Sequence, residues 1–221
     1  MKTNRFSRAT PRGVTSLDVL VVIATVALLV VVFQTVLQPR RQKGGHPRTC
    51  VSNLKQVSYA FRVWANDHAE KFPWEVSPER GGVRDEPFTT VAVRTYMMLS
   101  NELNTPKVLV CPQDRQRVWA KNWRLTHKNV SYFVGLDATT DSPAALLSGD
   151  RNLVGDGQPL GPGRHALAQF KQVQFGTNLH NRAGRIGFAD GSVLQASETS
   201  LQQSIESAIY GGTTNLFIAV P

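Results

Sequence analysis

The chain has 221 residues, a formal net charge of +9 and hydrophobic residues at 41% of its positions. This length is sufficient for one compact domain of ordinary size besides an N-terminal segment of about 40 residues. The positive charges are dispersed, and no basic stripe or nucleic-acid-binding motif is present, so nucleic acid is not an expected partner.

A short basic leader precedes a long apolar segment at the N-terminus. Four basic residues precede Gly13, and residues 14–33 are almost entirely apolar. About 20 such residues suffice to cross a bilayer, so the pattern predicts a transmembrane helix over 14–37. Asp18 lies just inside this helix. A carboxylate at bilayer depth costs roughly 2.5 to 3.5 kcal/mol, so it calls for a cationic partner.

This N-terminal pattern resembles the type III signal of bacterial type IV pilins and type II secretion pseudopilins. In that family a prepilin peptidase cuts after the glycine and methylates the new N-terminus. The resemblance implies cleavage between Gly13 and Val14 and N-methylation of Val14. It also implies that Asp18, at the fifth mature position, guides assembly by pairing with the amine of a neighbouring subunit. The family usually has glutamate at that position.

A kink or linker is expected over 38–47, where prolines and glycines interrupt the helical pattern. Helical periodicity resumes in a second segment, whose apolar residues recur at intervals of three and four and form one stripe that can face a sheet. The stripe consists of Val51, Leu54, Val57, Phe61 and Trp64. Residues 50–56, in the order Cys-x-x-Asn-Leu-Lys-Gln, with the later Phe72-Pro73, resemble the corresponding part of longer prepilin-like proteins.

The middle of the chain gives weaker signals. Residues 74–93 are predicted to form a long surface loop, and 96–103 a short helix. Residues 130–136 have the β-branched and aromatic content of a strand. Residues 155–163, with four glycines and two prolines, are predicted to form a flexible connection and lack the ending of a phosphate-binding loop.

The C-terminal region carries a hairpin signal. Asp190 and Gly191 lie between two alternating segments, a dipeptide that favours a tight turn with positive φ at both positions. A helix over 201–210 and a closing strand over 215–220 follow. His180, with the later sequence Phe-Ala-Asp-Gly-Ser-Val, resembles the C-terminal signature of the same prepilin-like group.

Together these resemblances imply an α+β, pilin-like fold. A long N-terminal helix, with a membrane half and an amphipathic half, would pack on a small antiparallel sheet. The expected segments are a basic leader at 1–13, the transmembrane helix at 14–37, the linker at 38–47 and a periplasmic globular domain at 48–221.

The chain has two cysteines, Cys50 and Cys111. Both lie in the part that the resemblance places outside the cytoplasm, where an even pair of cysteines favours a disulfide. Two buried free thiols are the alternative.

No catalytic motif is present, so an enzyme is not expected. No metal or other cofactor is assigned. Calcium is possible because major pseudopilins commonly bind it in a C-terminal loop, but the acids of this region match no calcium loop and are expected to be solvated or to cap helices. They are Asp137, Asp141, Asp150 and Asp156. A pair of His180 with Asp190 would form a hydrogen bond across the hairpin or, alternatively, a metal site.

The function that the resemblance implies is that of a pseudopilin-like structural subunit. It would assemble with its own copies into a type II secretion or type IV pilus-like filament, with prepilin peptidase, the secretion or pilus machinery and the membrane as partners. Its expected location is the bacterial inner membrane, crossed once, with the globular domain in the periplasm. The alternatives are an ordinary signal peptide, or a membrane-tethered extracytoplasmic binding or enzymatic domain with a pilin-like anchor.

Overall fold

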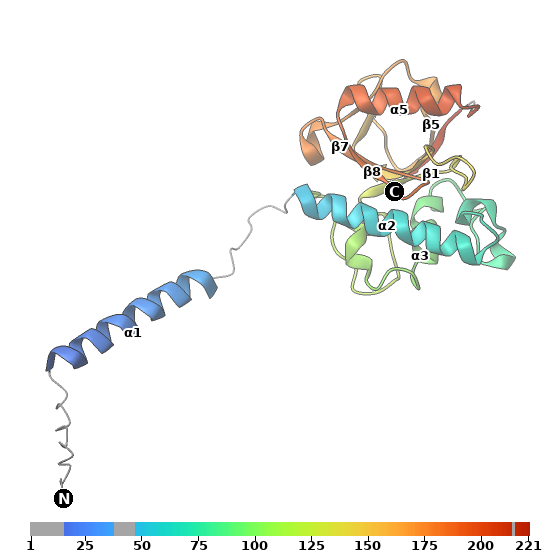
Figure 1. The fold of residues 1–221 in the computed structure, drawn as a ribbon. Coiled ribbons are helices and arrows are strands. Elements are labelled where there is room, and N and C mark those ends of the chain that lie inside the picture. Colours follow the sequence, from blue (N-terminus) through green and yellow to red (C-terminus); the bar gives the residue numbers. More distant parts are fainter. Residues whose placement is uncertain (1–15, 38–46, 214) are drawn as a thin grey trace, which may run out of the picture. The chain divides into compact units, whose positions relative to one another are not determined.

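The computed structural model describes residues 16–37, 47–213 and 215–221, without the side chains of 32–37, 47 and 48. The chain divides into two units, Met1–Lys43 and Gly44–Pro221. The second unit, called the head below, contains the described strands (Figure 1). The predicted leader and most of the predicted linker lie outside the described residues.

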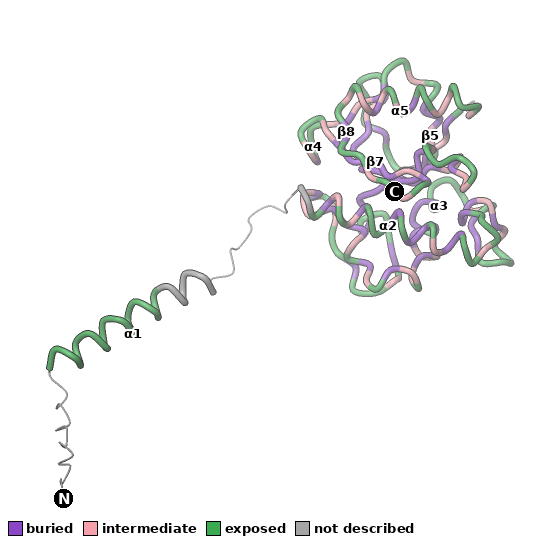
Figure 2. Tube along the Cα trace, viewed as in Figure 1, coloured by how far each residue is buried: buried purple, intermediate pink, exposed green. Residues whose placement is uncertain are grey.

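Helix α1, Ser16–Leu37, is apolar around its whole circumference. For example, the six consecutive residues 19–24 are all apolar, and six residues cover more than one full helical turn. The described side chains of α1, from 16 to 31, are all exposed (Figure 2). Thr25 donates its hydroxyl hydrogen to the carbonyl oxygen of Val22 at 2.8 Å, which satisfies a polar group within an apolar helix.

The membrane prediction fails on this helix. Among the residues that the structure describes, no helix is long and apolar enough to cross a membrane. This finding contradicts the predicted single-pass location in the bacterial inner membrane.

Helix α2, Pro47–Asp67, uses the predicted apolar stripe to pack in the head. Leu54, Val57 and Phe61 are fully buried, and Trp64 is nearly so. Proline is suited to the first position of a helix, because the backbone N–H at that position makes no hydrogen bond within the helix and its absence costs nothing. The described part of this helix starts at Pro47.

Six strands form the main sheet in the described part of the head. Their order is β5-β9-β1-β2-β7-β8, and all neighbours are antiparallel. The strands are β5 (Gly163–Ala166), β9 (Phe217–Val220), β1 (Tyr132–Gly135), β2 (Leu146–Asp150), β7 (Gly184–Phe188) and β8 (Val193–Ala196). Because β9 pairs with both β1 and β5, the C-terminal segment lies inside the sheet.

Two hydrophobic cores lie on opposite faces of the main sheet. Along β1, Tyr132 and Val134 belong to the core with α2, whereas Phe133 belongs to the second core. Helix α5, Glu198–Tyr210, contributes Leu201 and Ile205 to that second core. Figure 1 shows the resulting layers, with α2 and α3 (Val91–Met98) on one side of the sheet and α5 on the other.

Shorter elements complete the head. A small sheet has the order β4-β3-β6, and β6 also contacts α5. Its strands are β3 (Leu153–Gly155), β4 (Gln158–Pro159) and β6 (Val173–Phe175), and helix α4 spans Thr177–His180. The 3-10 turns are η1 (Pro73–Glu75), η2 (Pro78–Arg80), η3 (Pro106–Leu109), η4 (His127–Asn129) and η5 (Leu167–Gln169).

The fold-class prediction needs correction. The head is α+β with antiparallel sheets, but the predicted long N-terminal helix of a membrane half and an amphipathic half is not shown: the described residues form two helices, α1 and α2, in separate units. The hairpin of β7 and β8 forms as predicted, although in its turn only Gly191 has a positive φ, of 88°. The predicted helix at 96–103 is replaced by α3, and the predicted flexible connection contains β4.

Candidate functional site

The residues predicted to direct processing and assembly belong to the N-terminal unit. Gly13 and Val14 lie outside the described residues. Asp18 lies in the first turn of α1, where the positive end of the helix dipole favours a carboxylate. Its side chain is exposed together with the rest of the described helix.

Cys50 and Cys111 form a disulfide, the pairing that the sequence favoured. Cys50 lies in the first turn of α2, and Cys111 follows the 3-10 turn η3. Their Cα atoms are 5.2 Å apart, which is within the usual range for a disulfide. Both residues are fully buried. The bond fastens the N-terminal end of α2 to the loop before β1.

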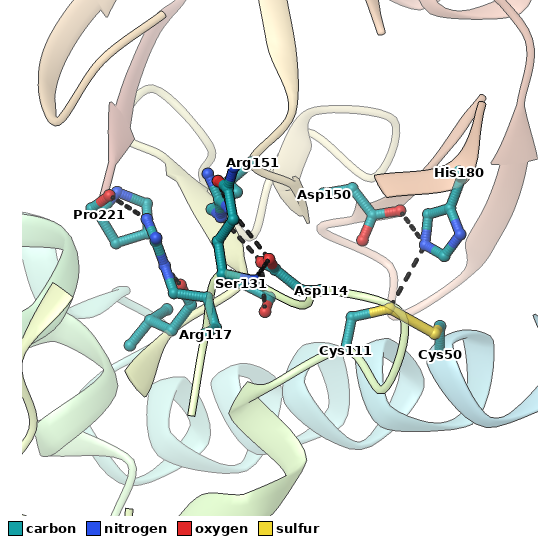
Figure 3. Close-up of polar contacts among 11 residues, drawn as sticks. Cys50, Cys111, Asp114, Arg117, Ser131, Asp150, Arg151, His180 and Pro221 are labelled. Atoms are coloured by element: carbon teal, nitrogen blue, oxygen red, sulfur yellow. Dashed lines mark hydrogen bonds and ion pairs between the residues drawn. A yellow bond between two sulfur atoms is a disulfide. The ribbon is translucent and has the colours of Figure 1, made fainter. Parts of the chain in front are cut away.

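His180 lies against this disulfide. It is the last residue of α4, and its Nε2 atom is 3.4 Å from Sγ of Cys111. The same Nε2 atom is 3.2 Å from Oδ2 of Asp150, at the end of β2. On the other side of the ring, Nδ1 contacts Oε1 of Gln113. Figure 3 shows this ring nitrogen facing both the Cys111 sulfur and the Asp150 carboxylate.

Asp150 is the charged centre of the cluster. Its residue is fully buried, and Oδ2 accepts a hydrogen bond from the backbone N–H of Arg185 at 2.8 Å. The guanidinium of Arg185, itself 3% exposed, lies 3.6 Å from the same oxygen. Among the described residues Oδ1 of Asp150 has no hydrogen-bond partner. A buried oxygen left without a partner carries a desolvation cost of about 1 to 3 kcal/mol.

The carboxylate of Asp150 also affects the pKa of a neighbouring tyrosine, Tyr132. Tyr132 lies directly across from Asp150 in the ladder between β1 and β2. Burial first, and the negative charge of Asp150 second, raise the pKa of Tyr132 above its usual value. We call the group formed by Cys50, Cys111, Gln113, Asp150, His180 and Arg185 the disulfide–histidine cluster.

A second polar group lies nearby and has a structural character (Figure 3). Arg151 binds both carboxylate oxygens of Asp114, at 2.8 and 2.9 Å, and Ser131 donates to the same carboxylate at 2.9 Å. Arg117 donates to the carbonyl oxygens of Val130 and Pro221. Burial, followed by the charge of Arg151, lowers the pKa of Arg117. These contacts fasten the loop after Cys111 to β1 and to the C-terminal segment.

The acids that were considered as calcium ligands make separate contacts in different parts of the head. Asp137 accepts the backbone N–H of Phe217 at 2.6 Å, and Asp156 accepts that of Gln172 at 2.9 Å. Asp141 is exposed. In the described part of the chain, Cys50, Cys111 and His180 are the group of three that has the spacing of metal ligands, with ligand atoms within 4.8 Å of one another.

Sequence reasoning found the disulfide but missed its polar neighbours. It considered His180 with Asp190, whereas the structure pairs His180 with Asp150. Asp190 instead accepts the backbone N–H of Ser192 at 2.8 Å, and its pKa is lowered chiefly by hydrogen bonding to Ser192. Asp150 follows a short apolar run and resembles an ordinary loop acid in the sequence, so no local signal marks it as buried.

Comparisons with protein-family models, with curated proteins and with solved structures find no match to this chain.

Proposed function

We propose that this chain is a structural subunit whose copies assemble into a filament through helix α1. The observation that carries the proposal is the exposure of apolar side chains around the whole described part of that helix. Eleven large ones are between 49% and 70% exposed: Leu17, Val19, Leu20, Val21, Val22, Ile23, Val26, Leu28, Leu29, Val30 and Val31.

A helix that is apolar on every side requires apolar neighbours on every side. Fully burying one Val, Leu or Ile side chain contributes about 1.5 to 3 kcal/mol. An interface with one partner would cover only one face of α1. A bundle of α1 helices from several copies covers all faces, and a staggered bundle that does not close extends into a filament.

The one acid in the described part of α1 supports this arrangement. Asp18 is the only charged residue between 14 and 37, and inside a helix bundle its carboxylate needs a cationic partner. An amine at the N-terminus of a neighbouring copy, created by cutting after Gly13, would supply that cation. Pairing between copies would also set their axial stagger.

The head supports the proposal through its organisation. Its two cores and its disulfide lie within the second unit, Gly44–Pro221. The chain thus divides into an apolar helix suited to polymerisation and a folded domain that a filament would display. The identity of the machine that uses such a filament, a secretion system or a pilus, does not affect the tests below.

The first test replaces the acid. We expect the wild-type chain, co-expressed with a prepilin peptidase, to sediment as filaments visible by electron microscopy. Asp18→Ala leaves the partner amine buried and unpaired, at a cost of about 3 to 5 kcal/mol, so filament yield should fall by more than about 100-fold. Asp141→Ala, at an exposed acid of the head, is the matched control and should assemble normally.

The second measurement is the N-terminus of the same material. Mass spectrometry should find a chain that begins at Val14 in both the wild type and Asp18→Ala. Gly13→Val should leave residues 1–13 attached and prevent assembly. Wild-type filament yield from Asp18→Ala, or native chains that begin at Met1 and remain monomeric, would contradict the proposal and favour a tethered binding or enzymatic domain.

A further inference from the structure

The disulfide–histidine cluster contains the kinds of donor atoms that bind zinc in proteins, but its two sulfur atoms are oxidised to a disulfide. Zinc in proteins is held by thiolate, imidazole and carboxylate ligands, most often four of them in a tetrahedron. The two sulfur atoms and Nε2 of His180 lie within 4.8 Å of one another, and Oδ2 of Asp150 is 3.2 Å from Nε2. Three donors of the right kinds therefore lie together, and a carboxylate oxygen lies beside the imidazole as a fourth candidate.

The atoms behind these donors are arranged as they are around zinc ligands. A zinc-bound histidine almost always donates its other ring N–H to an oxygen, which orients the ring. In this protein Nδ1 of His180 contacts the amide oxygen of Gln113. When Nδ1 donates there, the lone pair of Nε2 is directed toward Cys111 and Asp150. The Asp150 carboxylate is itself held by the backbone N–H of Arg185.

The charges of the cluster also fit a divalent cation. Two thiolates and the Asp150 carboxylate carry three negative charges, and the guanidinium of Arg185 carries one positive charge. A Zn²⁺ ion brings the sum to zero, which a buried site requires. The unpartnered Oδ1 of Asp150 is one further oxygen at this point.

We propose that reduction of the Cys50–Cys111 disulfide converts this cluster into a zinc site. A dithiol reductant supplies two electrons, so the S–S bond breaks, each sulfur takes up a proton, and the reductant becomes a disulfide. Zn²⁺ then replaces the two thiol protons and binds Cys50, Cys111, His180 and Asp150. While the S–S bond is intact, the sulfur atoms are not thiolates and the site is closed.

The location of Cys50 provides the route for reduction. Both half-cystines are fully buried, so a dithiol reaches them only when the structure opens locally. Cys50 lies in the first turn of α2, and helix ends open at a lower free energy than the rest of a domain. After reduction, zinc would restore the link between α2 and the Cys111 loop and add α4 and β2 to it.

The test uses the full chain, reduced with a dithiol that is then removed by anaerobic desalting, with both thiols counted. We expect one Zn²⁺ per reduced chain and none per oxidised chain. Co²⁺ in its place should show the absorption of tetrahedral thiolate coordination. His180→Ala should lower the zinc affinity of the reduced chain by about 100-fold or more, because removing a ligand exceeds the 10- to 100-fold effect of an outer-shell partner.

His127→Ala, at an exposed histidine, is the matched control and should bind zinc like the wild type. If the reduced chain unfolds without metal, zinc should restore its far-UV circular dichroism, because the ion binds the folded state. Three results would each overturn the proposal: a reduced chain with two counted thiols that takes up no zinc, equal zinc affinity in His180→Ala, or zinc binding by the oxidised chain.

Discussion

At the scale of single residues, the centre of the head depends on a buried hydroxyl. Tyr96 of α3 is fully buried, and its hydroxyl oxygen lies 3.0 Å from the carbonyl oxygen of Phe133 and 2.7 Å from Oγ of Ser148. Burial raises the pKa of Tyr96, and the hydrogen bond between its hydroxyl and Ser148 only partly opposes this. One phenol group thus connects α3 to both β1 and β2.

This pKa shift makes stability depend on alkaline pH. The folded state keeps the Tyr96 proton above pH 10, whereas the unfolded chain releases it near pH 10. The free energy of unfolding should therefore be unaffected by this group below about pH 10 and fall as the pH rises further. Tyr132 shifts in the same direction and adds to the fall.

The variant Tyr96→Phe tests this argument. It should lower the free energy of unfolding at neutral pH by about 1 to 3 kcal/mol, because the partners of the hydroxyl lose a buried hydrogen bond. In this variant the free energy of unfolding should also fall less steeply above pH 10 than in the wild type. Urea unfolding from pH 7 to 11 measures both effects, and Tyr59→Phe, at an exposed tyrosine, should change neither. An unchanged alkaline decline in Tyr96→Phe would show that this tyrosine is not its source.

At the scale of elements, α2 packs closely against the sheet at Gly187 of β7. A Cβ atom at this position would overlap Oγ of Ser58 on α2, whereas its next neighbours, Leu54 and Ser148, lie at an ordinary 3.6 Å. The Ser58 hydroxyl is buried and has no hydrogen-bond partner among the described residues. Close contact between helix and sheet here depends on the absence of one side chain.

This contact predicts a rescue experiment. Gly187→Ala should lower the free energy of unfolding by about 1 to 3 kcal/mol, the usual cost of overpacking. Adding Ser58→Ala removes the overlapping oxygen and should recover most of that loss. The double-mutant cycle, measured by urea unfolding, should give a favourable coupling energy of about 0.5 to 3 kcal/mol. Additive losses would mean that the overlap is relieved in another way.

The elements differ in how well the sequence predicts them. The α2 stripe, β1 and the hairpin of β7 and β8 follow from periodicity and turn residues, which are local properties. Periodicity does not reveal which strands pair over long distances, so the insertion of β9 between β1 and β5 was not predicted. The contact between His180 and Asp150 depends on the pairing of β2 with β7 and on the placement of α4, and it was missed for the same reason.

At the scale of the whole molecule, the disulfide stabilises the head because it lowers the conformational entropy of the unfolded chain. Cys50 and Cys111 are 61 residues apart, and closing a loop of that length contributes about 4 kcal/mol in the chain-entropy model. The double variant Cys50→Ala with Cys111→Ala should therefore unfold at a lower urea concentration than the oxidised wild type.

The comparison with reduced wild type separates two effects. Without metal, the reduced chain should resemble the double variant, because both lack the cross-link. With zinc, only the reduced wild type should regain stability. If the double variant unfolds at the same urea concentration as the oxidised chain, the disulfide contributes no net stability.

The position of β9 has a consequence for biosynthesis. β9 is made after every other described strand, yet it fills the gap between β1 and β5, and Arg117 holds the carbonyl of Pro221 behind it. On the ribosome, a nascent head without residues 217–220 has the sheet β1-β2-β7-β8 with an open edge at β1 that can pair with another chain, and β5 lacks its partner strand. Its main sheet is completed only after residues 217–220 have left the ribosome, so the growing polypeptide is prone to aggregation until then.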